Sequence, residues 1–266
     1  MFNIEERAQE EGLMPKTILK EYLQVSILEY LYSVPESDAI TFQGGTCLRL
    51  LYGGPRYSED LDFVVTGFED LPGIFKKVSS EVGKLSPLFG ANLRMEVRKE
   101  SESLARWKLY YEPADEDGNV SVSAEFAKYP AYTPQLLPLK LPKGYPAAPM
   151  ILVKAETEQE ILADKLNAAA TRKYLKGRDI FDIWLLKSRG VAVDAGMVEK
   201  KFRDYSSPVV SIEDRIARFS VEQVRQDLEN YLPRAYRERF QREGYGILLD
   251  AAREAGAEAD RQMRKA

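Results

Sequence analysis

Two aspartates two positions apart, Asp60 and Asp62, are the residues whose type and spacing most directly suggest chemistry. Alternate residues of a β-strand share a face, so in an extended segment their backbone positions lie about 6–7 Å apart on the same side. Leu61 and Phe63 then point to the opposite side. Mg²⁺ prefers carboxylate oxygens and takes its remaining ligands from water and substrate phosphates. The pair therefore predicts a site for Mg²⁺ or for the similar ion Mn²⁺.

Two adjacent glycines, Gly44 and Gly45, precede the aspartates at an expected turn before a helix-like segment at residues 46–52. Glycine has no side chain to keep phosphate oxygens away from its N–H group, and a helix beginning here adds further N–H donors. Alone, such a pair is typical of a turn, and Asp-x-Asp alone is typical of a solvated strand edge. Because both occur close together, with Ser58 two residues before Asp60, they favour a phosphate and metal site.

The composition of the 266-residue chain excludes several classes of mechanism. It has no histidine and a single cysteine, Cys47, so Ser-His-Asp and Cys-His catalysis, an intramolecular disulfide and a Cys/His zinc site are all absent. We expect Cys47 to be a small core residue. Carboxylates, lysines and tyrosines remain for acid–base work, which suits metal-assisted phosphoryl transfer.

Charge and hydropathy bound the partners and the location. No run of 18 apolar residues occurs, and residues 1–16 are charged and lack the apolar segment of a secretory signal, so we expect a cytoplasmic protein that does not enter a membrane. A net charge of −4 argues against a surface that binds nucleic acid everywhere. Residues 165–178 nevertheless contain basic side chains and no acid, namely Lys165, Arg172, Lys173, Lys176 and Arg178.

The elements that must position these groups are predicted from periodicity. Apolar spacing predicts helices over residues 15–33 and 71–88, and alternation predicts strands over residues 93–97, 106–111 and 120–128, with a turn at 115–119. Residues 130–149 contain six of the 14 prolines and are expected to be a loop or linker where the domain changes. Residues 156–190 are expected to be helical with one break near Gly177, and the rest predominantly helical with further breaks at Pro208 and Pro233.

The pattern Gly-Gly-Thr-x-Leu-Arg at residues 44–49, followed by Arg56-x-Ser58-x-Asp60-x-Asp62-Phe63, resembles the first two motifs of the AbiEii/AbiGii toxin family. That family belongs to the DNA polymerase β-type nucleotidyltransferases, and the resemblance covers roughly residues 20–186. It implies an α+β fold, with a nucleotidyltransferase lobe built on a mixed sheet at residues 1–149 and a mainly helical lobe at residues 150–266. It also implies that the metal ligands include Asp60 and Asp62 and that the nucleotide is contacted by Gly44, Gly45, Thr46, Arg49 and Ser58.

A third carboxylate is expected on a later strand, because the resembled superfamily places one there. In the strand predicted over residues 120–128, Glu125 shares the polar face with Ser121 and Ser123. Glu125 is therefore our candidate for the third metal ligand. Glu96, on an earlier predicted strand, is the competing candidate, and an exposed strand glutamate is the ordinary alternative for either.

A second constellation lies in the helical half. Lys165 and Arg172 fall on the same side of one predicted helix, and the next helix begins with Arg178, Asp179 and Asp182. Spacing alone favours a helix pair joined by salt bridges. The resembled family carries a lysine, an arginine and an Arg-Asp-x-x-Asp-like segment here and directs them to the nucleotide. The resemblance thus implies that Lys165 neutralises triphosphate charge, that Arg172 and Arg178 assist, and that Asp179 or Asp182 orients the lysine or binds substrate.

The resemblance implies an Mg²⁺-dependent enzyme that transfers a nucleoside monophosphate from an NTP to an acceptor and releases pyrophosphate. The implied acceptor is RNA, especially a tRNA 3′ end, and the implied role is the toxin of a type IV-like toxin–antitoxin pair with a cognate antitoxin. The residues leave open an enzyme that modifies a protein or a small molecule such as an antibiotic, and a non-catalytic binding protein. The basic and aromatic residues near 234–245 are more typical of a solvated helix face than of an RNA contact.

Overall fold

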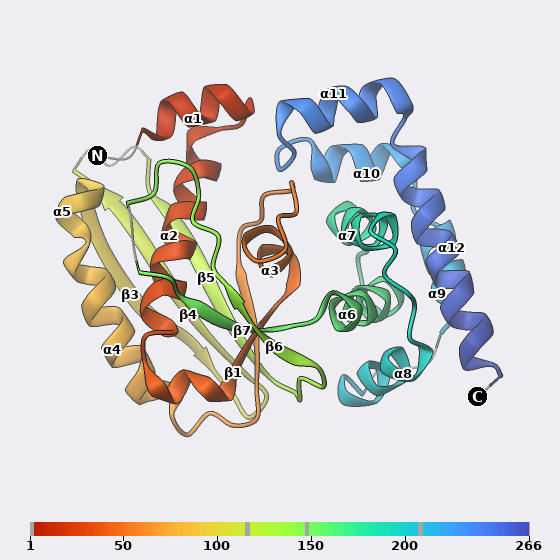
Figure 1. Ribbon diagram of the computed structural model, residues 1–266, viewed down its shortest axis with the longest axis horizontal. Helices are drawn as coiled ribbons and strands as arrows, with labels where there is room; N and C mark the ends of the chain where they lie inside the picture. Colours follow the sequence, from red (N-terminus) through yellow and green to blue (C-terminus); the bar gives the residue numbers. More distant parts are fainter. Residues whose placement is uncertain (1–2, 115–117, 147–148, 207–209, 266) are drawn as a thin grey trace. The chain divides into compact units, whose positions relative to one another are not determined.

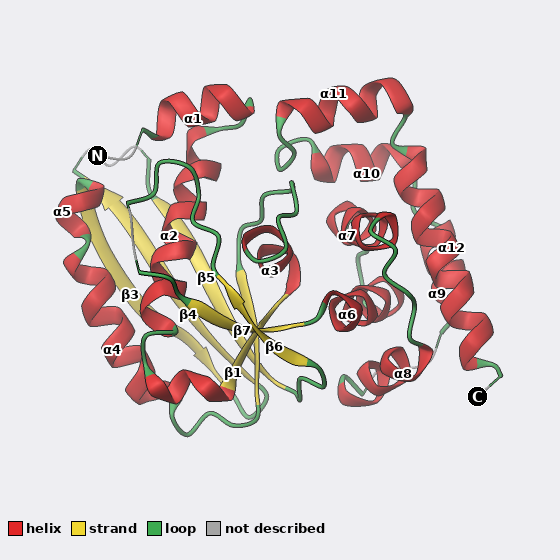
Figure 2. Cartoon of the chain, in the orientation of Figure 1, coloured by secondary structure: helices red, strands yellow, loops and turns green. Residues whose placement is uncertain are grey.

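The computed structural model describes residues 3–114, 118–146, 149–206 and 210–265 (Figure 1). The chain forms two compact units, Met1–Ala155 and Glu156–Ala266. The first contains a β-sheet and helices, whereas the second is built from helices (Figure 2). This mixed architecture confirms the predicted α+β class.

The described residues of the first unit contain a seven-stranded mixed sheet in the order β3-β4-β5-β2-β1-β7-β6. Strands β3, β4 and β5 are antiparallel neighbours, β2 runs parallel to β5 and antiparallel to β1, and β1 runs parallel to β7. The strands are β1 (Ile40–Gln43), β2 (Leu61–Val65), β3 (Ala91–Glu100), β4 (Leu104–Pro113), β5 (Val120–Lys128), β6 (Pro134–Pro138) and β7 (Leu152–Glu156).

A row of aromatic side chains holds the centre of the sheet in register. Phe63 on β2 stacks on Phe126 of β5, with ring centroids 4.9 Å apart, and also lies 5.1 Å from the ring of Phe42 on β1. Trp107 of β4 completes the row, 4.3 Å from Phe126. All four side chains are buried. Because side chains alternate along a strand, the residues next to these phenylalanines are directed to the other face of the sheet.

Helices of the first unit cover this sheet. The central one is α2, which packs against α4 and β5, and its buried residues include two polar ones, Glu21 and Gln24. Pro15 occupies its first turn, where a missing N–H costs no hydrogen bond. The helices are α1 (Ile4–Glu11), α2 (Pro15–Leu31), the 3₁₀ turn η1 (Pro35–Ala39), α3 (Gly44–Leu50), α4 (Leu71–Lys84) and α5 (Ser86–Phe89).

The second unit is a helical bundle with an aromatic cluster. Phe181 and Trp184 of one helix contact Phe240 of another, and Tyr245 also contacts Phe240. Its described helices are α6 (Glu158–Thr171), α7 (Gly177–Ser188), α8 (Ala195–Asp204), α9 (Ile212–Ala217), α10 (Val221–Leu228), α11 (Arg234–Glu243) and α12 (Gly246–Met263). Across the described parts of both units, no helix combines the length and apolarity that crossing a membrane requires.

Most elements agree with the sequence predictions, and the differences have physical reasons. The predicted strand over residues 120–128 matches β5, with its apolar face buried as expected. The helix predicted over residues 71–88 divides at Leu85 into α4 and α5, because Pro87 begins a new turn that Gly90 ends. The segment 130–149, expected to lack regular structure, contains the edge strand β6. The predicted turn at 115–119 lies partly outside the described residues.

Candidate functional site

A row of polar side chains crosses the centre of the sheet on the face opposite the aromatic row. Asp62 of β2 lies opposite Gln43 of β1 on one side and opposite Glu125 of β5 on the other. Arg106 of β4 lies opposite Glu125 in turn. Directly opposite residues share a face, and adjacent strands are about 4.8 Å apart, so the two carboxylates occupy neighbouring positions. All four side chains are half-buried, which leaves them accessible to a ligand.

The two candidates for a third carboxylate occupy very different places. Glu125 is one strand from Asp62, and Arg106 Nη2 lies 2.8 Å from its Oε1. Glu96 is on β3, three strands from β2, which corresponds to roughly 14 Å at ordinary strand spacing. Its carboxylate forms ion pairs with Arg94 and Arg98. The structure therefore brings Glu125, and not Glu96, next to the aspartate pair.

We call the neighbouring carboxylates Asp62 and Glu125 the carboxylate row, and the glycine pair lies against its Asp62 end. Gly44 has a φ of 81°, and a Cβ added to it would lie 2.8 Å from Asp62 Oδ2. A Cβ added to Gly45 would lie 2.1 Å from an Arg56 Nη2 atom. Position 44 thus suits glycine for its backbone conformation, and a side chain at either position would displace a neighbouring side chain, Asp62 or Arg56. The helix α3 begins at Gly44 itself, two residues before the predicted start.

The segment after α3 brings the other motif residues to the same place. The Thr46 hydroxyl donates a hydrogen bond to the backbone carbonyl of Asp60, which fixes that aspartate just before β2 begins. The Ser58 hydroxyl lies 3.4 Å from the position that a Cβ on Gly45 would occupy. Arg56 is buried and donates from Nη1 to the Tyr57 carbonyl. Gly44, Gly45, Thr46, Ser58, Asp60 and Asp62 are therefore gathered as the sequence predicts.

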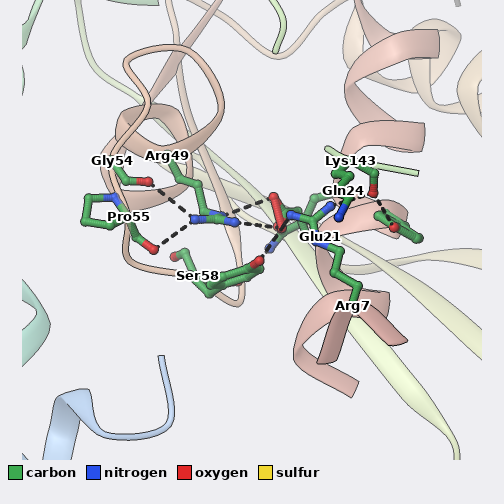
Figure 3. Close-up of polar contacts among 10 residues, drawn as sticks. Arg7, Glu21, Gln24, Arg49, Gly54, Pro55, Ser58 and Lys143 are labelled. Carbon is green, nitrogen blue, oxygen red and sulfur yellow. Dashed lines mark hydrogen bonds and ion pairs between the residues drawn. The ribbon is translucent and has the colours of Figure 1, made fainter. Parts of the chain in front are cut away.

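Arg49, the remaining motif residue, is directed elsewhere. Its Nε and Nη2 atoms donate to the two oxygens of Glu21, each at 3.1 Å. Its Nη1 atom donates to the carbonyls of Gly54 and Pro55 (Figure 3). Each nitrogen of the guanidinium therefore has a protein acceptor.

The donor set suits a hard cation whose coordination a substrate completes. Within the described parts of the chain, no group of three Asp, Glu, His or Cys side chains is arranged to hold a metal ion alone. Mg²⁺ bound through one or two carboxylates plus substrate phosphates does not need such a group. Asp60 and Asp62 offer oxygen donors of that kind beside the open backbone of Gly44. Their chemistry and position fit the ion.

The second predicted constellation is an ion-pair cluster inside the second unit. Lys165 Nζ lies 3.0 Å from Asp179 Oδ1 and 2.8 Å from Asp182 Oδ2, and Arg172 also pairs with Asp179. Both aspartates are 1% exposed. Arg178 is placed differently, since its guanidinium lies over the ring of Tyr231, 4.7 Å from the centroid. The structure thus unites four of the five residues in the helix–helix salt bridges that spacing alone favours.

A second buried cluster in this unit was missed by the sequence analysis. Lys201 of α8 is 1% exposed and forms ion pairs with Glu156, Glu160 and Asp164. Burial raises the pKa of Glu156 well above its usual value, and the charge of nearby Asp164 raises it further. Burial opposes the charge on Lys201, yet the surrounding acids raise its pKa overall. The spacing of Glu160 and Asp164 was the available signal, because residues four apart lie along one side of a helix, here α6, while Glu156 ends the preceding strand β7.

Comparisons with known proteins agree with this geometry. A family model described as "Nucleotidyl transferase AbiEii toxin, Type IV TA system" matches residues 26–259. The chain is similar in structure to MenT4, a nucleotidyltransferase toxin from Mycobacterium tuberculosis, with 21% identity, a TM-score of 0.63, and coverage of 100% of this chain and 97% of that one. It is also similar to JHP933 from Helicobacter pylori, with 20% identity, a TM-score of 0.52, and coverage of 95% and 94%.

No curated protein matches the sequence. The two structural similarities are below 25% identity and bear on the fold, whereas the family model spans most of the chain and both of its units. The residues that the family model matches include the strands of the sheet, the glycine pair and the carboxylate row. The chain belongs to the AbiEii family of nucleotidyltransferase toxins of type IV toxin–antitoxin systems.

Proposed function

We propose that this protein transfers a nucleoside monophosphate from an NTP to an RNA acceptor, a tRNA 3′ end in particular, and releases pyrophosphate. The observation that carries the proposal is the apposition of Asp62 and Glu125 on adjacent strands beside Gly44 and Gly45, in a chain of a nucleotidyltransferase toxin family. A nucleotide-binding protein without catalysis has no need of such a carboxylate row.

The metal ion would be held by Asp60 and Asp62, with Glu125 as the third ligand. When bound, Mg²⁺ supplies charge neutralisation at the transferring phosphoryl group and favours the ionised form of an attacking hydroxyl. Because a carboxylate has two oxygens, Glu125 could hold the cation while one of them keeps its ion pair with Arg106.

The residues around the row would bind and orient the triphosphate. Gly44 and Gly45 let phosphate oxygens approach the backbone, because neither has a side chain in the way. The Ser58 hydroxyl beside Gly45 can donate a hydrogen bond to a phosphate oxygen. Arg56, whose guanidinium also lies against Gly45, adds positive charge at that place.

The cluster of the second unit would contribute further charge. We propose that Lys165, positioned by Asp179 and Asp182, neutralises part of the triphosphate charge, with Arg172 and Arg178 nearby in the sequence. Two carboxylates on one ammonium fix its position, and Lys165 retains 12% side-chain exposure, so it is not sealed in the core.

An RNA acceptor is supported by the exposed segment between α6 and α7. Lys173 and Lys176 are exposed there, and Tyr174 between them is 72% exposed. Arg215 holds the start of this segment by donating to the carbonyls of Ala170 and Arg172. Basic groups beside an aromatic ring suit a nucleic acid strand, because phosphates pair with the former and bases stack on the latter. The arginines of α11 support it less, since Arg239 is paired with Glu243.

The family implies an antitoxin partner, and in the proposed reaction the cell supplies both the NTP and the tRNA in the cytoplasm. We propose that the antitoxin reverses the growth arrest that modification of the acceptor causes. Expression of the chain should therefore arrest growth only while the carboxylate row is intact.

Transfer of label tests the reaction directly. Each of the four α-labelled NTPs is incubated with Mg²⁺ and total tRNA, with wild type, Asp60→Asn and the distant variant Glu96→Gln in parallel. We expect labelled RNA with wild type and Glu96→Gln, and none with Asp60→Asn or with EDTA. Label on the protein itself or on a small acceptor, with none on RNA, would overturn the RNA acceptor while retaining the transferase. No transfer to any acceptor would overturn the enzyme.

A further inference from the structure

The segment between α3 and β2, residues 51–60, has neither helix nor strand, yet it carries Arg56, Ser58 and Asp60. Its shape is set by side chains that donate hydrogen bonds to its backbone carbonyls. These bonds run from Arg49 to the carbonyls of Gly54 and Pro55, from Arg56 to that of Tyr57, from Gln24 to that of Ser58, and from Thr46 to that of Asp60. We call residues 51–60 the motif loop.

Helix α2 provides one of these donors, Gln24, and holds a second one, Arg49, in place. Gln24 Nε2 donates to the Ser58 carbonyl at 3.0 Å, and Gln24 is 2% exposed. Glu21, one turn earlier, accepts both Nε and Nη2 of Arg49, so it receives the planar guanidinium in a two-point contact. The two α2 residues thus act on two places in the motif loop, Glu21 through Arg49 at residues 54–55 and Gln24 directly at Ser58 (Figure 3).

Further contacts fix the Glu21–Arg49 pair itself. Arg7 Nη2 lies 3.5 Å from Glu21 Oε2 and donates to the Tyr57 hydroxyl at 3.1 Å. The Arg49 guanidinium lies over the Tyr57 ring, 3.3 Å from its centroid. Burial raises the pKa of Tyr57, and the Glu21 charge raises it further, so its hydroxyl stays protonated. The side chain of Arg49 is 13% exposed and that of Glu21 is 4% exposed.

We infer that Glu21, Gln24 and Arg49 are positioning residues, which set the motif loop so that Ser58 and Asp60 face the phosphate site, and that Arg49 acts without touching the nucleotide. The inference rests on the proposed function for the reaction concerned. All three guanidinium nitrogens of Arg49 already donate to protein acceptors, and two of those acceptors are the loop's own carbonyls.

Lysine at position 49 separates positioning from nucleotide contact. It keeps the positive charge but lacks the planar fork that joins Glu21 to Gly54 and Pro55 at once. If Arg49 contacts phosphate mainly through its charge, Arg49→Lys should keep much of the activity. If Arg49 instead joins three protein acceptors, Arg49→Lys should lose that activity. Gln24→Met is the second variant, because it removes the donor to Ser58 while retaining an unbranched side chain of similar size.

The experiment combines hydrogen exchange with kinetics for Arg49→Lys, Gln24→Met and the control Arg94→Lys, the same change at an exposed ion pair on β3. We expect amide exchange in the motif loop to rise about tenfold or more in the first two, with exchange in β5 unchanged. We expect kcat to fall on the order of 10- to 100-fold while KM for the NTP changes less than about threefold. Arg94→Lys should match wild type.

Three results would overturn the inference. An increase in KM of about tenfold or more in Arg49→Lys, with kcat unchanged, would assign Arg49 to the nucleotide. Unchanged amide exchange in the motif loop of both variants would contradict the positioning role. Faster amide exchange with unchanged turnover would contradict it as well. Should Arg49→Lys not fold, Gln24→Met alone decides. If wild type transfers no label, the proposed reaction fails, but the positioning role can still be tested. Amide exchange in the motif loop and equilibrium binding of a non-hydrolysable NTP then provide that test.

Discussion

Asp62 and Glu125 lie directly opposite one another on the parallel strands β2 and β5. This register places Glu125 next to Asp62, the carboxylate that lies against Gly44, whereas Glu96 lies three strands from β2. The relationship separates the two residues that sequence reasoning left in competition.

Glu125→Gln should lower NTP transfer on the order of 100-fold or more, because an amide is a weaker ligand for Mg²⁺ and carries no charge to balance it. Steady-state kinetics across a series of Mg²⁺ concentrations would measure the effect. Glu96→Gln is the matched control and should retain wild-type turnover. A larger loss for Glu96→Gln than for Glu125→Gln would reverse the assignment of the third carboxylate.

Gly45→Ala should abolish most of the activity with a moderate loss of stability. The new methyl group would overlap Arg56 Nη2, and a buried guanidinium must then move away from its place beside Ser58. Overpacking of this kind costs about 1–3 kcal/mol, which urea unfolding would detect. Gly73→Ala serves as the control, because nothing lies within 4 Å of its added Cβ. Wild-type turnover in Gly45→Ala would show that this close approach is not required.

Lys201→Met should destabilise the second unit by about 3–5 kcal/mol, because it leaves three buried acids without their cation. The free energy of unfolding, measured by urea denaturation and circular dichroism, would show the loss. Lys84→Met is the comparison: its ion pair with Glu81 is exposed, so a change within about 0.5 kcal/mol is expected. Similar losses in both variants would mean that the buried cluster contributes no more than a surface pair.

Glu156 should make stability depend on pH. Its pKa is raised in the folded protein, chiefly by burial and then by Asp164, so folding favours the protonated form. The stability that this contributes is fully present below the ordinary pKa of the unfolded chain and is lost as pH rises through the raised value. Glu156→Gln keeps an uncharged side chain, and it should therefore gain stability relative to wild type as pH rises from about 5 to about 7. Urea unfolding at both ends of that range would measure the gain, and a constant difference would contradict it.

Local patterns predicted the elements well, and contacts between distant segments account for what they missed. Alternation predicted β5 with its bounds and the orientation of Glu125, because a strand's faces follow from its own residues. It could not predict that β5 would pair with β2, which depends on the whole sheet. Glu21 and Arg49 lie in separate helices, so their pairing likewise has no signal in either segment.

The strand β6 shows a different limit. Pro134 and Pro138 stand at its two ends, and the density of prolines around it predicted a loop. Proline is tolerated at an edge strand, where one row of backbone groups has no partner strand to satisfy. β6 is the last strand in the sheet order. These prolines are compatible with a strand only because β6 lies at the edge of the sheet. The sequence alone does not show which strand will lie there.

The parallel pairing of β2 with β5 also has a consequence for when the site forms during synthesis. Parallel neighbours cannot be joined by a tight turn, and here β3 and β4 intervene in the chain. A nascent chain that has emerged only as far as β4 contains the glycines and both aspartates but not the strand that carries Glu125. The carboxylate row therefore cannot form until residues 120–128 have been synthesised, and a nascent chain carries an incomplete candidate site until the fifth strand has joined the sheet.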